Sequence, residues 1–177
     1  VITFFANQQQ VLWLDQAGIL WQQTSGDTRP RQLNEKPLIV EAETPYKIFA
    51  YRNDLFIQKN QILYLLNPQT KIFEEFFSPL YEMVLSPDGR TLALSSGKEI
   101  WLYFFEEDRE QPRRQKGEKL FLTRLSEDIK NLVWFNSHYL IFARGDSIVV
   151  SEIDNRDNLN TAELTKFSNP SFFWQDN

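Results

Sequence analysis

A strand–turn–strand pattern is clearest at residues 85–94, Leu85-Ser86-Pro87-Asp88-Gly89-Arg90-Thr91-Leu92-Ala93-Leu94. Its Pro and Gly stand where a type I turn accepts them, and apolar residues flank the turn on both sides. The same order of an aromatic or apolar residue, a polar turn and a new apolar run recurs along the chain. The residues that open each recurrence are Phe5, Phe49, Leu85, Trp134 and Trp174, which lie 44, 36, 49 and 40 residues apart.

A second set of positions repeats with a similar period. Ile19, Ile62, Ile100 and Ile148 each open an apolar run after a turn, at intervals of 43, 38 and 48 residues. Blades of WD-type propellers repeat every ~40–45 residues and contain four strands each. No window of helical length carries a capped apolar stripe. The repeat therefore predicts an all-β fold, and specifically a β-propeller.

The repeats divide the chain, taken as one domain, into about four four-stranded antiparallel blades and the first strand of a fifth. The expected blades span residues 1–34, 38–77, 81–125 and 129–167, with a partial fifth at 171–177. Propellers typically have about 4–8 blades, and four blades plus one strand match no obvious closed ring. We therefore expect a fragment of a larger propeller. The chain opens at Val1 inside an apolar run, which also suggests a piece of a longer protein.

The composition is that of a globular protein with an unusual share of aromatic residues. Of 177 residues, 42% are hydrophobic, 24% charged and 15% aromatic, and large flat side chains suit the half-buried surfaces of stacked sheets. The formal net charge of −5 offers no basic face to a phosphate backbone, which argues against nucleic acid as a partner. The chain has no cysteine, so disulfides and thiol chemistry are excluded. No apolar run approaches the roughly 20 residues that span a bilayer, so we expect no membrane insertion by this segment.

Two resemblances to known families follow from these motifs. Residues 85–94 resemble the Ser-Pro-Asp-Gly element of TolB-type, WD-like propeller repeats, although Asn, Gln and Asp replace Pro-Asp-Gly at the other turns. The segments 134–140 (WFNSHYL) and 151–158 (SEIDNRDN) resemble propellers found beside PEGA domains in surface proteins of minimal, uncultured bacteria. The second resemblance implies an extracytoplasmic, cell-surface propeller, tethered by an upstream membrane helix that lies outside the chain.

The sequence contains no pattern of a catalytic site. A nucleophilic triad needs a base beside an activated nucleophile. The single histidine, His138, falls in a strand–turn–strand connection, and no Gly-x-Ser-x-Gly elbow occurs. We interpret His138 as a surface turn residue and the charged stretch 106–118 as a solvated loop. A Lys or carboxylate mechanism stays formally open, but spacing singles out no pair. We expect no enzymatic activity, no catalytic residue and no cofactor.

Four loop residues are the candidate binding residues: Arg144, Asp146, Asp154 and Asp157. The first two belong to an Arg-Gly-Asp tripeptide of the kind that integrin receptors recognise, but a hairpin turn explains its Gly. The other two belong to the richest cluster of oxygen ligands, residues 154–160. That cluster lacks a Gly and contains an Arg, so Asx turns that cap a hairpin are favoured over a calcium site. We expect no metal site.

The predicted function is that of a non-enzymatic binding or scaffolding propeller, which presents loops and a channel to a protein, peptide or glycan partner. The alternative is an accessory or gating propeller of a larger hydrolase or peptidase whose catalytic domain lies outside the chain. A third interpretation places a calcium-dependent or sugar-binding site in the loop at Asp154. Consecutive aromatic residues, at 103–105 and 172–174, are expected to pack between blades, where both faces of an inner strand are buried. Trp134 is expected in the same core.

Overall fold

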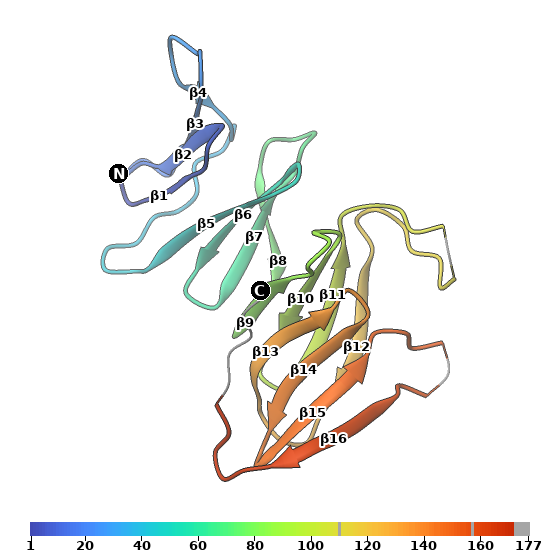
Figure 1. Ribbon diagram of the computed structural model, residues 1–177. Coiled ribbons are helices and arrows are strands. Elements are labelled where there is room, and N and C mark those ends of the chain that lie inside the picture. Colours follow the sequence, from blue (N-terminus) through green and yellow to red (C-terminus); the bar gives the residue numbers. More distant parts are fainter. Residues whose placement is uncertain (110, 157, 172–177) are drawn as a thin grey trace. The chain divides into compact units, whose positions relative to one another are not determined.

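The computed structural model describes residues 1–109, 111–156 and 158–171. These residues form sixteen strands, which make four antiparallel four-stranded sheets, as the repeat predicts (Figure 1). Within each sheet, strands that are consecutive in sequence are neighbours in space. No helix long and apolar enough to cross a lipid bilayer occurs in this described part of the chain. The expected strand of a fifth blade, with Trp174, lies outside the described residues.

The chain divides into two compact units, each of which contains two sheets. Unit 1 comprises Val1–Pro79 and unit 2 comprises Leu80–Asn177. The interpretation of the chain as a single domain stays a prediction.

Unit 1 contains the first two sheets. The first consists of β1 (Thr3–Ala6), β2 (Gln10–Leu14), β3 (Leu20–Thr24) and β4 (Arg31–Gln32), and the second of β5 (Tyr46–Tyr51), β6 (Asp54–Lys59), β7 (Ile62–Leu66) and β8 (Phe73–Phe77). Alternating apolar residues of β2 and β5 meet in a shared core that includes Leu12, Leu14 and Ile48. The buried side chain of Asn34 stabilises the connection between the sheets. Its amide oxygen accepts from the Leu20 amide at 2.7 Å, and its nitrogen donates to the Gly18 carbonyl at 3.0 Å.

Unit 2 contains the other two sheets. The third sheet consists of β9 (Glu82–Leu85), β10 (Thr91–Ser95), β11 (Glu99–Phe104) and β12 (Lys119–Arg124), and the fourth of β13 (Ile129–Asn136), β14 (Tyr139–Arg144), β15 (Ser147–Glu152) and β16 (Thr161–Lys166). Their facing sides form one core, in which Leu102, Phe142 and Trp134 are almost completely buried. The predicted core position of Trp134 is confirmed.

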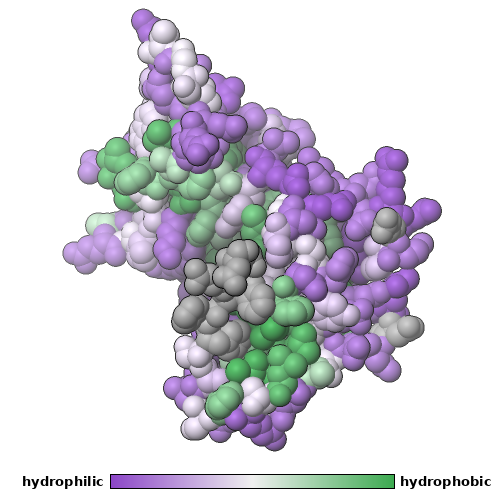
Figure 2. Space-filling model, in the orientation of Figure 1, coloured by the Kyte–Doolittle hydropathy of each residue, from purple (hydrophilic) through white to green (hydrophobic). Residues whose placement is uncertain are grey.

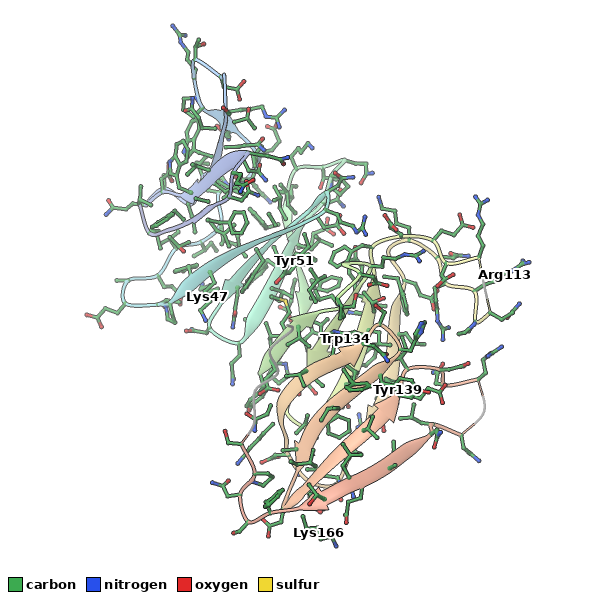
Figure 3. The ribbon with its side chains drawn as sticks, viewed as in Figure 1. Lys47, Tyr51, Arg113, Trp134, Tyr139 and Lys166 are labelled. Atoms are coloured by element: carbon green, nitrogen blue, oxygen red, sulfur yellow. The ribbon has the colours of Figure 1, made fainter. Side chains whose placement is uncertain are left out.

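The inner strands of unit 2, β9 and β13, are joined by side chains as well as by packing. The Glu82 carboxylate accepts hydrogen bonds from the backbone N–H groups of Asn131 at 2.8 Å and Leu132 at 2.6 Å. Both residues lie in an irregularity of the β13–β14 register, where the strand cannot satisfy those groups itself. The indole N–H of Trp134, a residue labelled in Figure 3, donates to the Val84 carbonyl at 3.0 Å. These contacts fix the relative position of the two sheets inside the unit.

The fourth sheet has apolar residues on both faces. Trp134 and Leu140 face the core, whereas Val133, Ile141 and Val150, which pair across β13, β14 and β15, lie on the opposite face and are partly exposed. Figure 2 shows this apolar surface over β13–β15 as a green area bordered by hydrophilic residues. A sheet that is apolar on both faces is the pattern expected of a propeller blade with a neighbour on each side.

Candidate functional site

A cleft of about 520 Å³ opens in unit 2, where connections from its two sheets meet. In an up-and-down antiparallel sheet, the first and third connections lie at the same end of the sheet. One end of the unit therefore contains four connections: the β9–β10 turn, the β11–β12 loop, the β13–β14 turn and the β15–β16 connection. We call this space the acidic cleft, and its lining includes Asp88, Arg90, Phe104, Glu106, Glu107, Asp108, Arg109, Ser137, His138 and Ile153.

The Ser-Pro-Asp-Gly turn fixes one wall of the acidic cleft. The Ser86 hydroxyl donates to Asp88 Oδ1 at 2.6 Å and accepts from the Thr91 amide at 2.9 Å, while the Arg90 amide donates to the same Asp88 oxygen at 3.0 Å. Gly89 has φ of 69°, a left-handed conformation that Gly adopts without steric cost. The turn residues that the sequence pattern identifies thus hold the Asp88 carboxylate in place.

The pKa of Asp88 lies below its usual value because opposing effects do not cancel. Partial burial raises the pKa, but hydrogen bonds from the Ser86 hydroxyl, the Arg90 amide and the Ser137 side chain lower it, and the Arg90 charge lowers it further. Hydrogen bonds to a carboxylate favour its ionised form. Asp88 is therefore an anion at neutral pH.

Ion pairs order the opposite wall of the cleft. Arg90 Nε lies 3.2 Å from Glu106 Oε2, and the Phe105 amide donates to the Arg90 carbonyl at 2.9 Å. Arg109 pairs with Glu107 at 3.4 Å, and both of these side chains are well exposed. Four carboxylates and two guanidinium groups line the cleft, so its formal charge is −2 when His138 is neutral.

The β11–β12 loop is anchored to the fourth sheet by Arg114. Its guanidinium lies 5.6 Å from the centre of the Phe104 ring, 3.5 Å from Glu118 and 3.1 Å from Asn155 Oδ1. The side chain is only 13% exposed. A cation that contacts an aromatic face, a carboxylate and an amide together holds a loop better than a single surface ion pair does. The charged stretch that the sequence indicates as a solvated loop is thus pinned at this residue.

His138 is an exposed residue of the β13–β14 turn and lines the acidic cleft. Its backbone amide donates to Asn136 Oδ1 at 2.8 Å. Ser137, beside it, forms a side-chain hydrogen bond with Asp88. A nucleophilic triad requires the imidazole between the hydroxyl and the carboxylate, whereas here the hydroxyl meets the carboxylate directly. The hydrogen bond between Ser137 and Asp88 connects the β13–β14 turn to the β9–β10 turn.

The predicted binding residues Arg144 and Asp146 lie at the other end of the fourth sheet, in and beside the β14–β15 turn. Asp146 is used locally, because its carbonyl accepts from the Phe167 amide at 2.9 Å and its Oδ1 accepts from the Asn169 amide at 3.0 Å. The Arg-Gly-Asp tripeptide therefore closes a hairpin and caps the chain after β16.

Asp154 lies at the same end of the sheet as the acidic cleft, next to the lining residue Ile153. Arg156 occupies its carboxylate, with contacts of 3.0 and 2.5 Å, and lowers the pKa of Asp154 through these hydrogen bonds. Asp157, the fourth predicted residue, lies outside the described residues. No group of three or more His, Asp or Glu side chains is arranged to hold a metal ion in the described ranges.

Comparisons with known proteins identify the fold. No protein-family model and no curated protein matches the chain. Among solved structures, the chain is similar to Hsv2 of Kluyveromyces lactis, with 15% identity and a TM-score of 0.54 over 93% of this chain and 52% of that one. It is also similar to the WD40 domain of SCAP from fission yeast, with 10% identity and a TM-score of 0.51 over 96% of this chain and 42% of that one. A third similar structure is the complex of the fission yeast SREBP–SCAP binding domains, with 11% identity and a TM-score of 0.51 over 96% of this chain and 49% of that one.

These similarities show the fold of a β-propeller, which the WD40 domain of SCAP also has. The chain spans about half the length of the solved chains that it matches, which agrees with the expected fragment of a larger propeller. The TolB-type and PEGA-associated resemblances, and with them a bacterial, extracytoplasmic origin, stay predictions.

Proposed function

We propose that the chain is a non-enzymatic binding module whose acidic cleft holds a basic segment of a protein partner. The observation that carries the proposal is the charge of the cleft, with four carboxylates and two guanidinium groups around a volume of about 520 Å³. Each guanidinium already lies within 3.4 Å of a carboxylate of the same cleft. The net negative charge of the cleft lining favours a Lys or Arg side chain.

Rigid positioning supports the same proposal. The cleft walls are a hydrogen-bonded turn at Asp88 and a loop anchored by Arg114, and a preorganised site loses less conformational entropy on binding. Ile153 and Phe104 contribute apolar surface, against which the methylene stem of a Lys or Arg can pack. Phe104 is only 7% exposed, so its ring offers little face for a sugar. A peptide fits these features better than a glycan.

The alternative of an accessory propeller in a larger hydrolase stays a prediction, because no described contact favours it. Extension of the sequence on both sides is the direct test of that alternative.

The experiment is fluorescence anisotropy with a labelled octapeptide of alternating lysine and serine, (Lys-Ser)₄, in about 0.15 M salt. Double charge reversal at the cleft, Glu107→Lys with Asp108→Lys, should weaken binding about tenfold, which corresponds to ~1.4 kcal/mol. The matched control reverses two adjacent exposed acids between β12 and β13, Glu127→Lys with Asp128→Lys. These lie at the opposite end of the unit and should change affinity less than twofold, since charges beyond ~8 Å are screened. Equal loss in the two variants would show non-specific attraction and refute the site.

A further inference from the structure

Unit 1 contains a second cleft, whose charge is opposite to that of the acidic cleft. It has a volume of about 520 Å³ and lies between β2–β4 of the first sheet and the β5–β6 and β7–β8 turns of the second. Three cationic side chains line it, Arg31, Arg52 and Lys71, against the single carboxylate of Glu35. Its formal charge is therefore +2, although unit 1 as a whole has seven Lys and Arg against eight Asp and Glu. We call this space the basic cleft.

The backbone at two of these cations is in a conformation that their residue types rarely adopt. Arg52 has φ of 52° and occupies a two-residue hairpin between the paired residues Tyr51 and Asp54, and Lys71 has φ of 56° in the β7–β8 turn. Gly or Asn adopts this left-handed region at a much lower steric cost. Strained backbone of this kind is concentrated at functional sites, where the side chain has a use that offsets the strain. The two cations thus stand where a turn alone would favour Gly or Asn.

Amide side chains continue the lining of the basic cleft from the first sheet. Gln22 Nε2 donates to Gln10 Oε1 at 2.5 Å, and Arg31 Nη2 donates to Gln22 Oε1 at 2.7 Å. The Gln10 side-chain nitrogen has no hydrogen-bond acceptor among the residues that the structure describes. Side-chain amides carry both donors and acceptors, which match the N–H and C=O groups of an extended peptide. The chain of hydrogen bonds holds these groups in place before a ligand binds.

We propose that the basic cleft binds an acidic peptide segment, with Asp or Glu carboxylates of the segment at Arg52 and Lys71 and its backbone at Gln10. Guanidinium and ammonium groups form charge-assisted hydrogen bonds with carboxylates. A nucleic acid fits less well, because Glu35 lies in the same cleft and the net charge of unit 1 is −1 by the residue counts above, whereas a phosphate backbone calls for a wider basic surface. This proposal concerns unit 1 and an acidic ligand, whereas the proposed function concerns unit 2 and a basic ligand. Either proposal can therefore be refuted without the other.

The test is anisotropy with a labelled (Glu-Ser)₄ octapeptide. Replacement of both strained cations, Arg52→Gly with Lys71→Gly, removes their charge and supplies the residue that the left-handed backbone prefers. We expect at least a tenfold loss of affinity with a melting temperature that is unchanged or higher. Retained binding in this folded variant would overturn the proposal.

Matched single variants separate the cleft from general electrostatic attraction. Lys71→Gln should weaken binding about threefold or more, whereas Lys47→Gln should leave it within twofold. Lys47 is an exposed residue near the start of β5, at the strand end opposite Arg52 (Figure 3). Five residues of strand separate these two positions by ~16 Å, which exceeds the screening length of ~8 Å in about 0.15 M salt. A labelled dT₈ oligonucleotide is the competing probe. If dT₈ binds more tightly than the peptide and loses that binding in the Gly variant, the site recognises nucleic acid and the proposal is wrong.

Discussion

Replacement of Trp134 by Ala should destabilise unit 2 by about 3–5 kcal/mol. The side chain is 4% exposed, and a buried aromatic residue removes ~200 Å² from water. At ~25 cal/mol per Å² the whole side chain contributes about 5 kcal/mol, of which Ala retains about 1. The substitution also removes the indole N–H that donates to the Val84 carbonyl at 3.0 Å, which adds about 1 kcal/mol. The expected loss therefore lies in the upper half of the range.

Urea unfolding followed by far-ultraviolet circular dichroism measures this loss, because the signal does not depend on tryptophan fluorescence. Trp134→Phe retains an aromatic ring and loses the indole hydrogen bond, so it should cost about 1–2 kcal/mol. Leu164→Ala, at a residue of β16 that is 55% exposed, should cost less than about 1 kcal/mol. A Trp134→Ala transition that coincides with that of the unchanged protein would refute the assignment of this residue to the core between the two sheets.

Three further substitutions test the contacts that shape each unit. Glu82→Ala leaves the two backbone N–H groups at the β13 irregularity without their acceptor and should cost about 2–3 kcal/mol in urea unfolding, and a cost below about 0.5 kcal/mol would contradict this role. Asp88 has a lowered pKa in the folded state, so its contribution is present above its unfolded pKa of ~3.9 and is lost as pH falls through the folded value. The unfolding free energy of the unchanged protein should therefore fall more steeply below about pH 4 than that of Asp88→Asn. The difference should be less than about 1 kcal/mol, because the carboxylate is partly solvated. Parallel pH curves for the two proteins would contradict this contribution of Asp88. Gly18→Ala places a Cβ 1.9 Å from the Leu38 carbonyl oxygen at a φ of 78°, so it should lower the melting temperature of unit 1. An unchanged melting temperature would contradict this close approach.

The fold was accessible from sequence because its signals are local and repeated. The turn at Ser86–Thr91 has a defined pattern of Ser, Pro, Asp and Gly, and the four-stranded sheets follow the period of the apolar runs. The irregularity at Asn131 was not predictable in this way. It depends on the Glu82 carboxylate, 49 residues earlier in the chain, and the local sequence around Asn131 does not indicate that hydrogen bond.

The acidic cleft was missed for a similar reason. Its residues belong to three connections, at Asp88, at Glu106–Arg109 and at Ser137–His138, and each looked like an ordinary turn or solvated loop. One signal could have joined them, since the first and third connections of successive blades share one end of the propeller. The candidates taken from short motifs, Asp146 and Asp154, make contacts close to their own turns. Asp146 Oδ1 accepts a hydrogen bond from the Asn169 amide after β16, and the Asp154 carboxylate accepts from Arg156, two residues further on.

The most direct test of the proposed function is a titration of ¹⁵N-labelled protein with unlabelled (Lys-Ser)₄, followed by ¹H–¹⁵N correlation spectra. Binding at the acidic cleft predicts shift changes concentrated in the amides of residues 88–91, 105–109 and 137–138, with little change at 127–128 and 145–146. Changes concentrated at the opposite end of the fourth sheet, or the absence of any change at millimolar peptide, would contradict it.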